Sequence, residues 1–343
     1  MEFLSEYGLF LLKAVTIVVA VLFVAGGLAS LAQRNQRHAP HGSIRVESLN
    51  DEFEEMADRI RAEVLPEDVL KREHKERRKR EKAREKEEAE HPRRRVFVLD
   101  FAGDIQASAA EDLRHEITAV LAVAGEKDEV VVRLDSGGGL VTGYGFAASQ
   151  LERIRRAKIP LTVCVDEIAA SGGYMMACVA DRVLAAPFAI VGSIGVVAQL
   201  PNFHRLLKKH EVDIELHTAG EYKRTLTVFG ENTDKAREKF REELEDAHQL
   251  FKQFITRWRP QVDIAAVATG EHWFALRGQE LKLVDELMTS DEYLVNATKD
   301  AEVFHVHWHH RKTFAERMGF AVESAFDRAL VRWWGRLTQR NLL

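Results

Sequence analysis

The sequence predicts an α/β fold, and two observations carry that prediction. Short runs of β-branched and apolar residues alternate with longer segments whose apolar residues recur every three or four positions. This alternation begins after Pro92 and continues to about residue 300, which indicates strands connected by helices in one domain. With 343 residues, the chain is long enough for one large domain with appended segments.

Each predicted element follows from its local pattern. Strands are expected where four to six residues are rich in Val, Leu and Ile, at residues 96–101, 130–134, 161–165 and 182–185. Helices are expected where the apolar period lengthens, at residues 109–124, 144–157 and 234–257, and a further helix–loop segment is expected at 270–288. We therefore place the catalytic or binding domain at residues 93–300.

The N-terminal segment predicts a membrane anchor. Residues 14–32 read AVTIVVAVLFVAGGLASLA, which is about the length that a helix needs to cross a bilayer. A cleaved signal peptide is the alternative, because Ser30 to Ala32 offers small residues for cleavage. The apolar run is longer than a usual signal core, and acidic Glu2 and Glu6 precede it. We expect residues 1–32 to form an uncleaved anchor.

Residues 33–92 predict a charged helical linker. Opposite charges recur three and four positions apart in the segment KREHKERRKREKAREKEEAEHPRRR, which favours a solvated helix without a core. Contact with anionic lipid headgroups is an alternative role for this segment. Acidic residues are mixed throughout and no aromatic residue interleaves, so we predict no nucleic-acid partner. The formal net charge of −5 and the apolar fraction of 46% indicate no particular partner.

The C-terminal tail, residues 301–343, predicts an amphipathic helix. Apolar residues recur every four positions with arginines between them, at Phe314, Met318, Val322, Phe326, Leu330 and Trp334. Its apolar face is expected to pack on the protein or a neighbouring subunit, and the membrane interface is the alternative.

Histidines and cysteines give no clear metal site. His305, His307 and His309 alternate, as side chains on one face of a strand would, and His310 follows. No cysteine or carboxylate nearby in the sequence completes a zinc set, so we predict no metal and no cofactor. Cys164 and Cys178 lie in apolar runs and are expected to be free core thiols.

The segment from Ile168 to Cys178 suggests a nucleophile. Ser171 stands among small residues where a strand-like segment gives way to an apolar helix, and Lys223 follows 52 residues later in a polar loop. A neutral, desolvated lysine can take the proton of a serine and so activate it. Three consecutive glycines, Gly137, Gly138 and Gly139, offer backbone N–H groups for an oxyanion. The alternatives are a turn serine, a solvated lysine and a tight strand-to-helix turn.

Three segments resemble the signal peptide peptidase A family. They are VVVRLDSGGG at residues 130–139, ASGGY at 170–174 and VGSIGV at 191–196, in the order and spacing of that family. The resemblance implies a ClpP/crotonase-type fold of repeated β-β-α units, with Ser171 as nucleophile and Lys223 as general base. It also implies that Ser193 orients the lysine. The family usually has proline where this chain has Ser136 or Gly137, a change that should loosen the loop without removing its N–H donors.

The resemblance further implies a membrane peptidase that works as an assembly. It implies extended peptide substrates, such as signal peptides or membrane-protein fragments, at the bacterial inner membrane. It also implies a homo-oligomer, with an octamer as the expected assembly, in which Ser171 of one chain meets Lys223 of the next. Positive charges after the anchor favour a cytoplasmic domain, whereas the family favours an extracytoplasmic one, so both sides stay open.

Three alternative functions remain at this point. Glycine-rich oxyanion loops also polarise thioesters, so an acyl-CoA enzyme of the crotonase superfamily is one alternative. A non-catalytic membrane scaffold, acting through the charged linker and the tail, is another. A Ser/His/Asp triad built on Asp166, Asp181 and His204 is the third, although no histidine stands in a recognisable motif with Ser171.

Overall fold

The computed structural model describes Thr16, residues 42–90 and residues 93–310. The predicted anchor and the predicted tail helix lie outside these residues. Among the helices described, none combines the length and the apolar character that a membrane crossing requires. Residues 44–308 form one compact unit.

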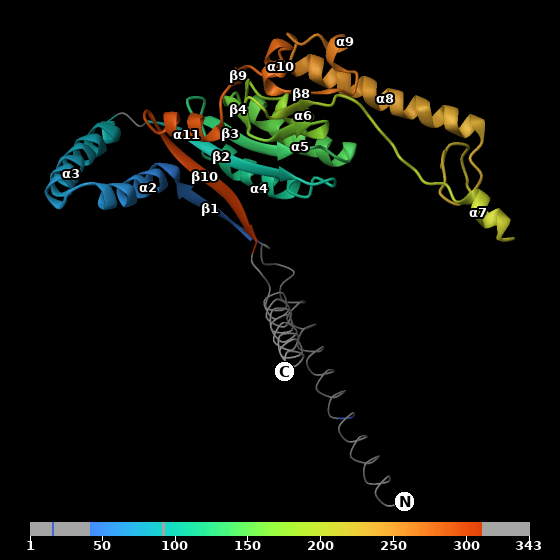
Figure 1. Ribbon diagram of the computed structural model, residues 1–343, viewed down its shortest axis with the longest axis horizontal. Helices are drawn as coiled ribbons and strands as arrows, with labels where there is room; N and C mark the ends of the chain where they lie inside the picture. Colours follow the sequence, from blue (N-terminus) through green and yellow to red (C-terminus); the bar gives the residue numbers. More distant parts are fainter. Residues whose placement is uncertain (1–15, 17–41, 91–92, 311–343) are drawn as a thin grey trace, which may run out of the picture. The chain divides into compact units, whose positions relative to one another are not determined.

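The described strands belong to one sheet, which is mostly parallel (Figure 1). They are β1 Gly42–Ser48, β2 Arg94–Gly103, β3 Glu129–Ser136, β4 Leu161–Val165, β5 Ile168–Ala170, β6 Arg182–Ala185, β7 Ile190–Gly192, β8 His272–Phe274, β9 Glu286–Leu287 and β10 Ala301–His310. The main order is β1-β10-β2-β3-β4-β6-β9. The short β5 pairs with β3 and β7, and β7 also pairs with β8.

The described helices connect and cover these strands. They are α2 Leu49–Val64, α3 Glu67–Glu90, α4 Ala110–Leu121, α5 Val141–Arg156, α6 Gly172–Ala177, α7 His204–Lys209, α8 Asp234–Trp258, α9 Ile264–Val267, α10 Ala275–Glu280 and α11 Ser290–Ala297. All four predicted strands and the three predicted helices are confirmed, with ends that differ by at most three residues. The predicted mixed α/β fold is therefore correct.

Both faces of the sheet are buried, which explains its nearly continuous apolar strands. In β2, Phe97, Leu99 and Phe101 enter the larger core cluster, which α4 and α5 cover. The alternate residues Val96 and Val98 enter a second cluster on the opposite face, which includes side chains of α11 and the first residue of α2. The two clusters follow from the two-residue period of a strand. Cys164 and Cys178 are buried free thiols, as predicted, and burial raises the pKa of Cys164 to about 12.

The sheet includes one strand that precedes the predicted 93–300 domain in the sequence and one strand that follows it. β1 comes from the predicted linker and β10 from the predicted tail. Asn50, in the first turn of α2, holds β10 with its side-chain amide, which accepts from the Val303 N–H at 2.7 Å and donates to the Ala301 carbonyl at 3.1 Å. The start of the linker is therefore part of the folded body.

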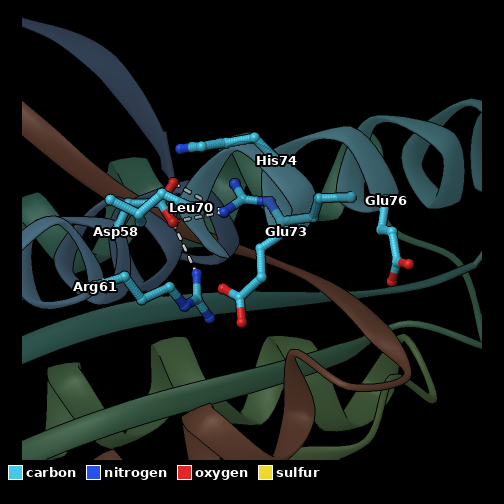
Figure 2. Close-up of a pocket in the computed structure, with 7 residues that line it drawn as sticks. Asp58, Arg61, Leu70, Glu73, His74 and Glu76 are labelled. Atoms are coloured by element: carbon cyan, nitrogen blue, oxygen red, sulfur yellow. Dashed lines mark hydrogen bonds and ion pairs between the residues drawn. The ribbon is translucent and has the colours of Figure 1, made fainter. Parts of the chain in front are cut away.

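The linker folds as two helices, α2 and α3, separated at Pro66. Asp58 of α2 binds Arg61 of its own helix and Arg77 of α3, with nitrogen–oxygen distances of 2.7 Å (Figure 2). These two guanidinium groups, Arg77 foremost, hold the pKa of Asp58 below its ordinary value. Charge pairing thus connects the two helices as well as supporting each of them.

Candidate active site

Ser171 lies at the junction between β5 and α6 in a strained backbone conformation. Its φ is 53° and its ψ is −117°, values that cost a residue with a side chain of order 1–3 kcal/mol. Its N–H donates to the Gly192 carbonyl at 2.8 Å, and its carbonyl accepts from the Met175 N–H at 2.9 Å. Such a sharp turn from strand to helix is known to present a nucleophilic serine at the end of a sheet.

The first turn of α6 is packed too tightly for side chains. A Cβ atom at Gly172 would lie 2.4 Å from the Tyr144 ring, and one at Gly173 would lie 2.3 Å from the Ser136 carbonyl oxygen. The two glycines therefore let the helix start directly against the end of β3 and against α5. This packing fixes the turn that carries Ser171, which is itself half-buried.

The glycine loop after β3 lies against the same serine. Gly138 has a φ of +87°, and a Cβ atom there would lie 2.6 Å from the Gly172 nitrogen and 2.8 Å from the Ser171 Cβ. The Gly138 N–H donates to the Ser136 hydroxyl at 3.1 Å, and that hydroxyl also hydrogen-bonds to the Tyr144 hydroxyl. The loop is thus held by side chains of its own strand and of α5.

Backbone N–H groups near Ser171 are available to a ligand. Among the described residues, and outside regular helix and strand pairing, no hydrogen bond to a protein acceptor is formed by the N–H groups of Gly137, Gly139 and Gly172. The Gly138 N–H, by contrast, is engaged by Ser136. The sequence analysis named Gly137 to Gly139 as donors and gave no such role to Gly172. The place of Gly172 directly after the serine, at a helix N-terminus, is the signal that could have identified it.

The structure brings Ser193 next to Ser171. β5 and β7 are parallel neighbours in which Ala170 is aligned with Gly192, so the residues that follow them lie side by side, roughly 5 Å apart along the sheet. Ser193 also has a positive φ, 54°, and its N–H donates to the Glu271 carbonyl at 2.7 Å. Two strained serines therefore stand at the ends of adjacent strands.

Lys223 lies in a different part of the chain. Its N–H closes a turn onto the Gly220 carbonyl at 3.2 Å. The preceding Glu221 forms an ion pair of 2.6 Å with Lys235, and the Tyr222 ring lies next to Lys235 and Lys239. This turn therefore lies beside the first two turns of α8.

Helix α8 separates that turn from the core. The buried side chains of α8 are Phe251 and Ile255, near its C-terminal end. Phe251 follows Lys235 by 16 residues, a separation of about 24 Å along a helix. We call residues 197–223 the arm; none of them is buried. Figure 1 shows the arm around α7 and the start of α8. Within one chain, the structure gives Lys223 no contact with Ser171.

The residues of the alternative triad are not assembled either. Asp166 accepts hydrogen bonds from the N–H and hydroxyl groups of Ser290, and Asp181 accepts from the Leu161 N–H at 3.0 Å. His204 begins α7 in the arm. The sequence analysis did not consider His272 of β8. This histidine is aligned with Gly192, so the strand register places it near the two serines.

Gly138 provides a test of the loop. A Gly138→Ala variant is expected to lose about 10²- to 10³-fold in kcat/KM toward a fluorogenic peptide, because its Cβ would displace the Gly172 N–H and the Ser171 side chain. Gly145→Ala is the matched control, since a Cβ atom at Gly145 on α5 would meet nothing within 4 Å. Near-normal activity of a folded Gly138→Ala protein would show that this loop has no part in the reaction.

Comparisons with known proteins give consistent matches along the chain. The peptidase family S49 N-terminal model matches residues 2–151, and the peptidase family S49 model matches residues 153–304. The chain is 47% identical over 334 residues to the probable protease SohB of Haemophilus influenzae, covering 94% of each protein. It is 52% identical over 240 residues to the protein of the same name from Buchnera aphidicola, covering 70% of this chain and 71% of that protein.

More distant similarities extend to a second kind of protease and to a solved structure. Protease 4 of Haemophilus influenzae is 26% identical over 189 residues, which are 52% of this chain and 31% of that protein. A mutant of the 1510-N membrane-bound stomatin-specific protease, solved in complex with a substrate peptide, aligns with a TM-score of 0.41 at 13% identity. That alignment covers 67% of this chain and 98% of the other.

Proposed function

Because the chain belongs to peptidase family S49, whose members are serine-type peptidases, we propose that it cleaves extended peptides with Ser171 as nucleophile and Lys223 as general base. The observation that carries the proposal is the strained turn at Ser171, held directly against a glycine loop and near available N–H groups. A non-glycine residue keeps such a backbone when its surroundings enforce it, as they do at active sites.

The reaction follows from this arrangement. The Ser171 hydroxyl gives its proton to the Lys223 amine as its oxygen attacks the substrate carbonyl, and a tetrahedral intermediate forms. The protonated lysine then gives the proton to the leaving amine, and the acyl-enzyme is hydrolysed by a water that the lysine deprotonates. Ser193 is proposed to orient the lysine, which agrees with its place beside Ser171 in the strand register.

The oxyanion is proposed to bind the glycine loop and the start of α6. The sequence analysis assigned this role to Gly137, Gly138 and Gly139; because the Gly138 N–H is bound by Ser136, we propose Gly137 or Gly139 as the donor of the loop, joined by Gly172. Removal of one such donor typically costs on the order of 3 kcal/mol of transition-state stabilisation. The helix dipole of α6 adds a partial positive charge at the same place.

The dyad is proposed to form between subunits of a homo-oligomer, with an octameric ring as the expected assembly. Lys223 lies on an arm without buried residues, and apolar side chains on that arm are exposed, among them Val197 at 91%, Leu206 at 54% and Tyr222 at 47%. A solvent-exposed apolar surface of this kind needs a partner. A lysine accepts a proton only when it is neutral, and covering it with a neighbouring subunit favours that neutral form.

We also propose that residues 1–32 anchor the enzyme in the bacterial inner membrane, where it acts on signal peptides or membrane-protein fragments. The apolar run at residues 14–32 supports the anchor. The side of the membrane that holds the catalytic domain stays open, as does the finer ClpP/crotonase-type description of the fold. Lipid contact of the charged helices is a further part of this proposal.

A serine-directed fluorophosphonate tests the nucleophile. Full-length protein in detergent is expected to take up one label per chain, and peptide mass spectrometry is expected to locate it at Ser171. Ser149→Ala, which removes an exposed serine of α5, is the control and should be labelled normally. A label on another residue, or peptide cleavage by protein that the reagent neither labels nor inhibits, would refute Ser171 as nucleophile.

A further inference from the structure

Three side chains from opposite ends of the chain meet on β1 and β10. A carboxylate oxygen of Glu47 and one ring nitrogen each of His305 and His307 lie within 4.8 Å of one another. The two histidines are two residues apart on β10 and so share one face of the strand, and β1 is the neighbouring strand in the sheet. The sequence predicted no metal site because no nearby cysteine or carboxylate completes a ligand set with these histidines along the chain; folding brings Glu47 from β1 to them.

Each of the two histidines buries one ring nitrogen that lies in no hydrogen bond. Among the described residues, Nδ1 of His307 and Nε2 of His305 are buried and form no hydrogen bond. The His305 Nε2 atom lies 3.0 Å from Asp100 Oδ2, close enough for an ion pair but outside the directions of a hydrogen bond. Buried polar atoms are nearly always satisfied, so the His307 Nδ1 atom, which has no partner and lies near Glu47 and His305, indicates a missing ligand.

Asp100 supplies negative charge at the edge of this cluster. The Arg133 guanidinium binds Asp100 through two hydrogen bonds, from Nε at 2.6 Å and from the terminal nitrogen at 2.8 Å. His305 is aligned with Val98 of β2, which places Asp100 on the same face as the two histidines. Carboxylates next to metal-binding histidines commonly orient the ring and balance the charge of the ion.

We propose that Glu47, His305 and His307 bind a divalent transition-metal ion, with zinc as the expected ion. Two imidazoles and one carboxylate are a ligand set that zinc accepts, with water or Asp100 in the fourth position. Tetrahedral bonds of about 2 Å from zinc to its ligands hold the ligand atoms roughly 3.3 Å apart. The ligand atoms of this cluster lie within 4.8 Å of one another, so small side-chain rotations bring them to that spacing. Hard ions such as Mg²⁺ and Ca²⁺ prefer oxygen ligands and should bind weakly.

The ion would connect the edge strand β1 to β10. Glu47 is exposed and β1 has few buried residues, so this strand has little apolar packing to hold it in the sheet. A metal bond between the two strands would fasten the start of the linker to the folded body. This role is structural and independent of Ser171, so its test does not depend on peptidase activity.

Zinc titration tests the site. The full-length protein, without a histidine tag and stripped with EDTA, is expected to bind one Zn²⁺ per chain with a Kd of about 1 µM or below in calorimetry. Saturating zinc is expected to raise the melting temperature by about 5 °C. Co²⁺ in place of zinc should give visible absorption bands of a nitrogen- and oxygen-ligated ion.

Ligand variants decide whether these residues form the site. Glu47→Gln and His307→Gln should each weaken zinc binding at least about tenfold and remove the thermal shift. Because Glu47 is exposed, its variant should fold normally. His217→Ala, which removes an exposed histidine 3.3 Å from Glu215, is the matched control and should bind zinc as the wild type does. Unchanged affinity in both ligand variants, or no zinc binding by the wild type, would overturn the proposal.

Discussion

Replacing Ser171 with alanine is expected to reduce peptide hydrolysis by at least about 10⁴-fold, because no other described hydroxyl replaces it on the turn against the glycine loop. Alanine keeps the Cβ atom and therefore the backbone strain, so the melting temperature should stay within about 2 °C of the wild type. Ser171→Gly should be equally inactive without loss of stability, because glycine adopts this backbone without strain. Initial rates on a fluorogenic peptide and circular-dichroism melting curves check both expectations.

The serine control for these variants is Ser149→Ala. Ser149 lies exposed on α5 and its hydroxyl donates to the Gly145 carbonyl of its own helix, so activity should be retained. If purified Ser171→Ala protein cleaves the peptide within tenfold of the wild-type rate, the nucleophile has been misassigned. Traces of host peptidases are excluded by repeating the assay with the Ser171→Gly protein.

Lys223→Ala and Lys223→Arg are each expected to be as inactive as Ser171→Ala, but a mixture of Ser171→Ala and Lys223→Ala subunits should regain activity. Guanidinium stays protonated, so arginine cannot serve as the base. In a randomly mixed ring, half of the subunits keep Ser171 and half of their partners keep Lys223. About a quarter of the sites should then be intact, and the rate should approach about a quarter of the wild-type rate. Co-expression with two affinity tags isolates the mixed assemblies.

A double variant supplies the matched control for mixing. Assemblies of Ser171→Ala with the Ser171→Ala/Lys223→Ala double variant contain no intact serine and should stay inactive. If mixed assemblies of the two single variants form and stay equally inactive, the dyad lies within one chain. If Lys223→Ala protein keeps its activity while His272→Ala protein loses it, the base is the histidine that the strand register places near the serines.

The central fold was predictable because its strands are buried on both faces. In β3, Val130 to Val132 are buried on both faces of the sheet, so these residues form a continuous apolar run. β5 and β7 have three residues each, too few to establish any periodicity, and they were not predicted. β1 was missed for another reason: it is an edge strand of seven residues that reads GSIRVES, and its place in the sheet depends on a partner from the far end of the chain.

The candidate site was predictable to the extent that it is local. Ser171 and the three glycines stand in short motifs, and the structure places them together. Ser193 came from family resemblance alone, because its position beside Ser171 depends on the pairing of β5 with β7. No local sequence pattern predicted that Lys223 lies far from Ser171 within one chain. This separation depends on the length of α8 and on the fact that its buried residues lie near its C-terminal end.

The strand order β1-β10-β2 has a consequence for the biogenesis of the enzyme. β1 leaves the ribosome early, yet the strand that separates it from β2 is β10, which begins only at Ala301. At typical translation rates, roughly 10–50 s pass between the synthesis of these strands. During that interval β2 has an open edge toward the position that β10 later fills, and such an edge can pair with other chains. The sheet therefore closes only after β10 has been synthesised, and until then the unpaired edge of β2 is a site at which nascent chains can associate.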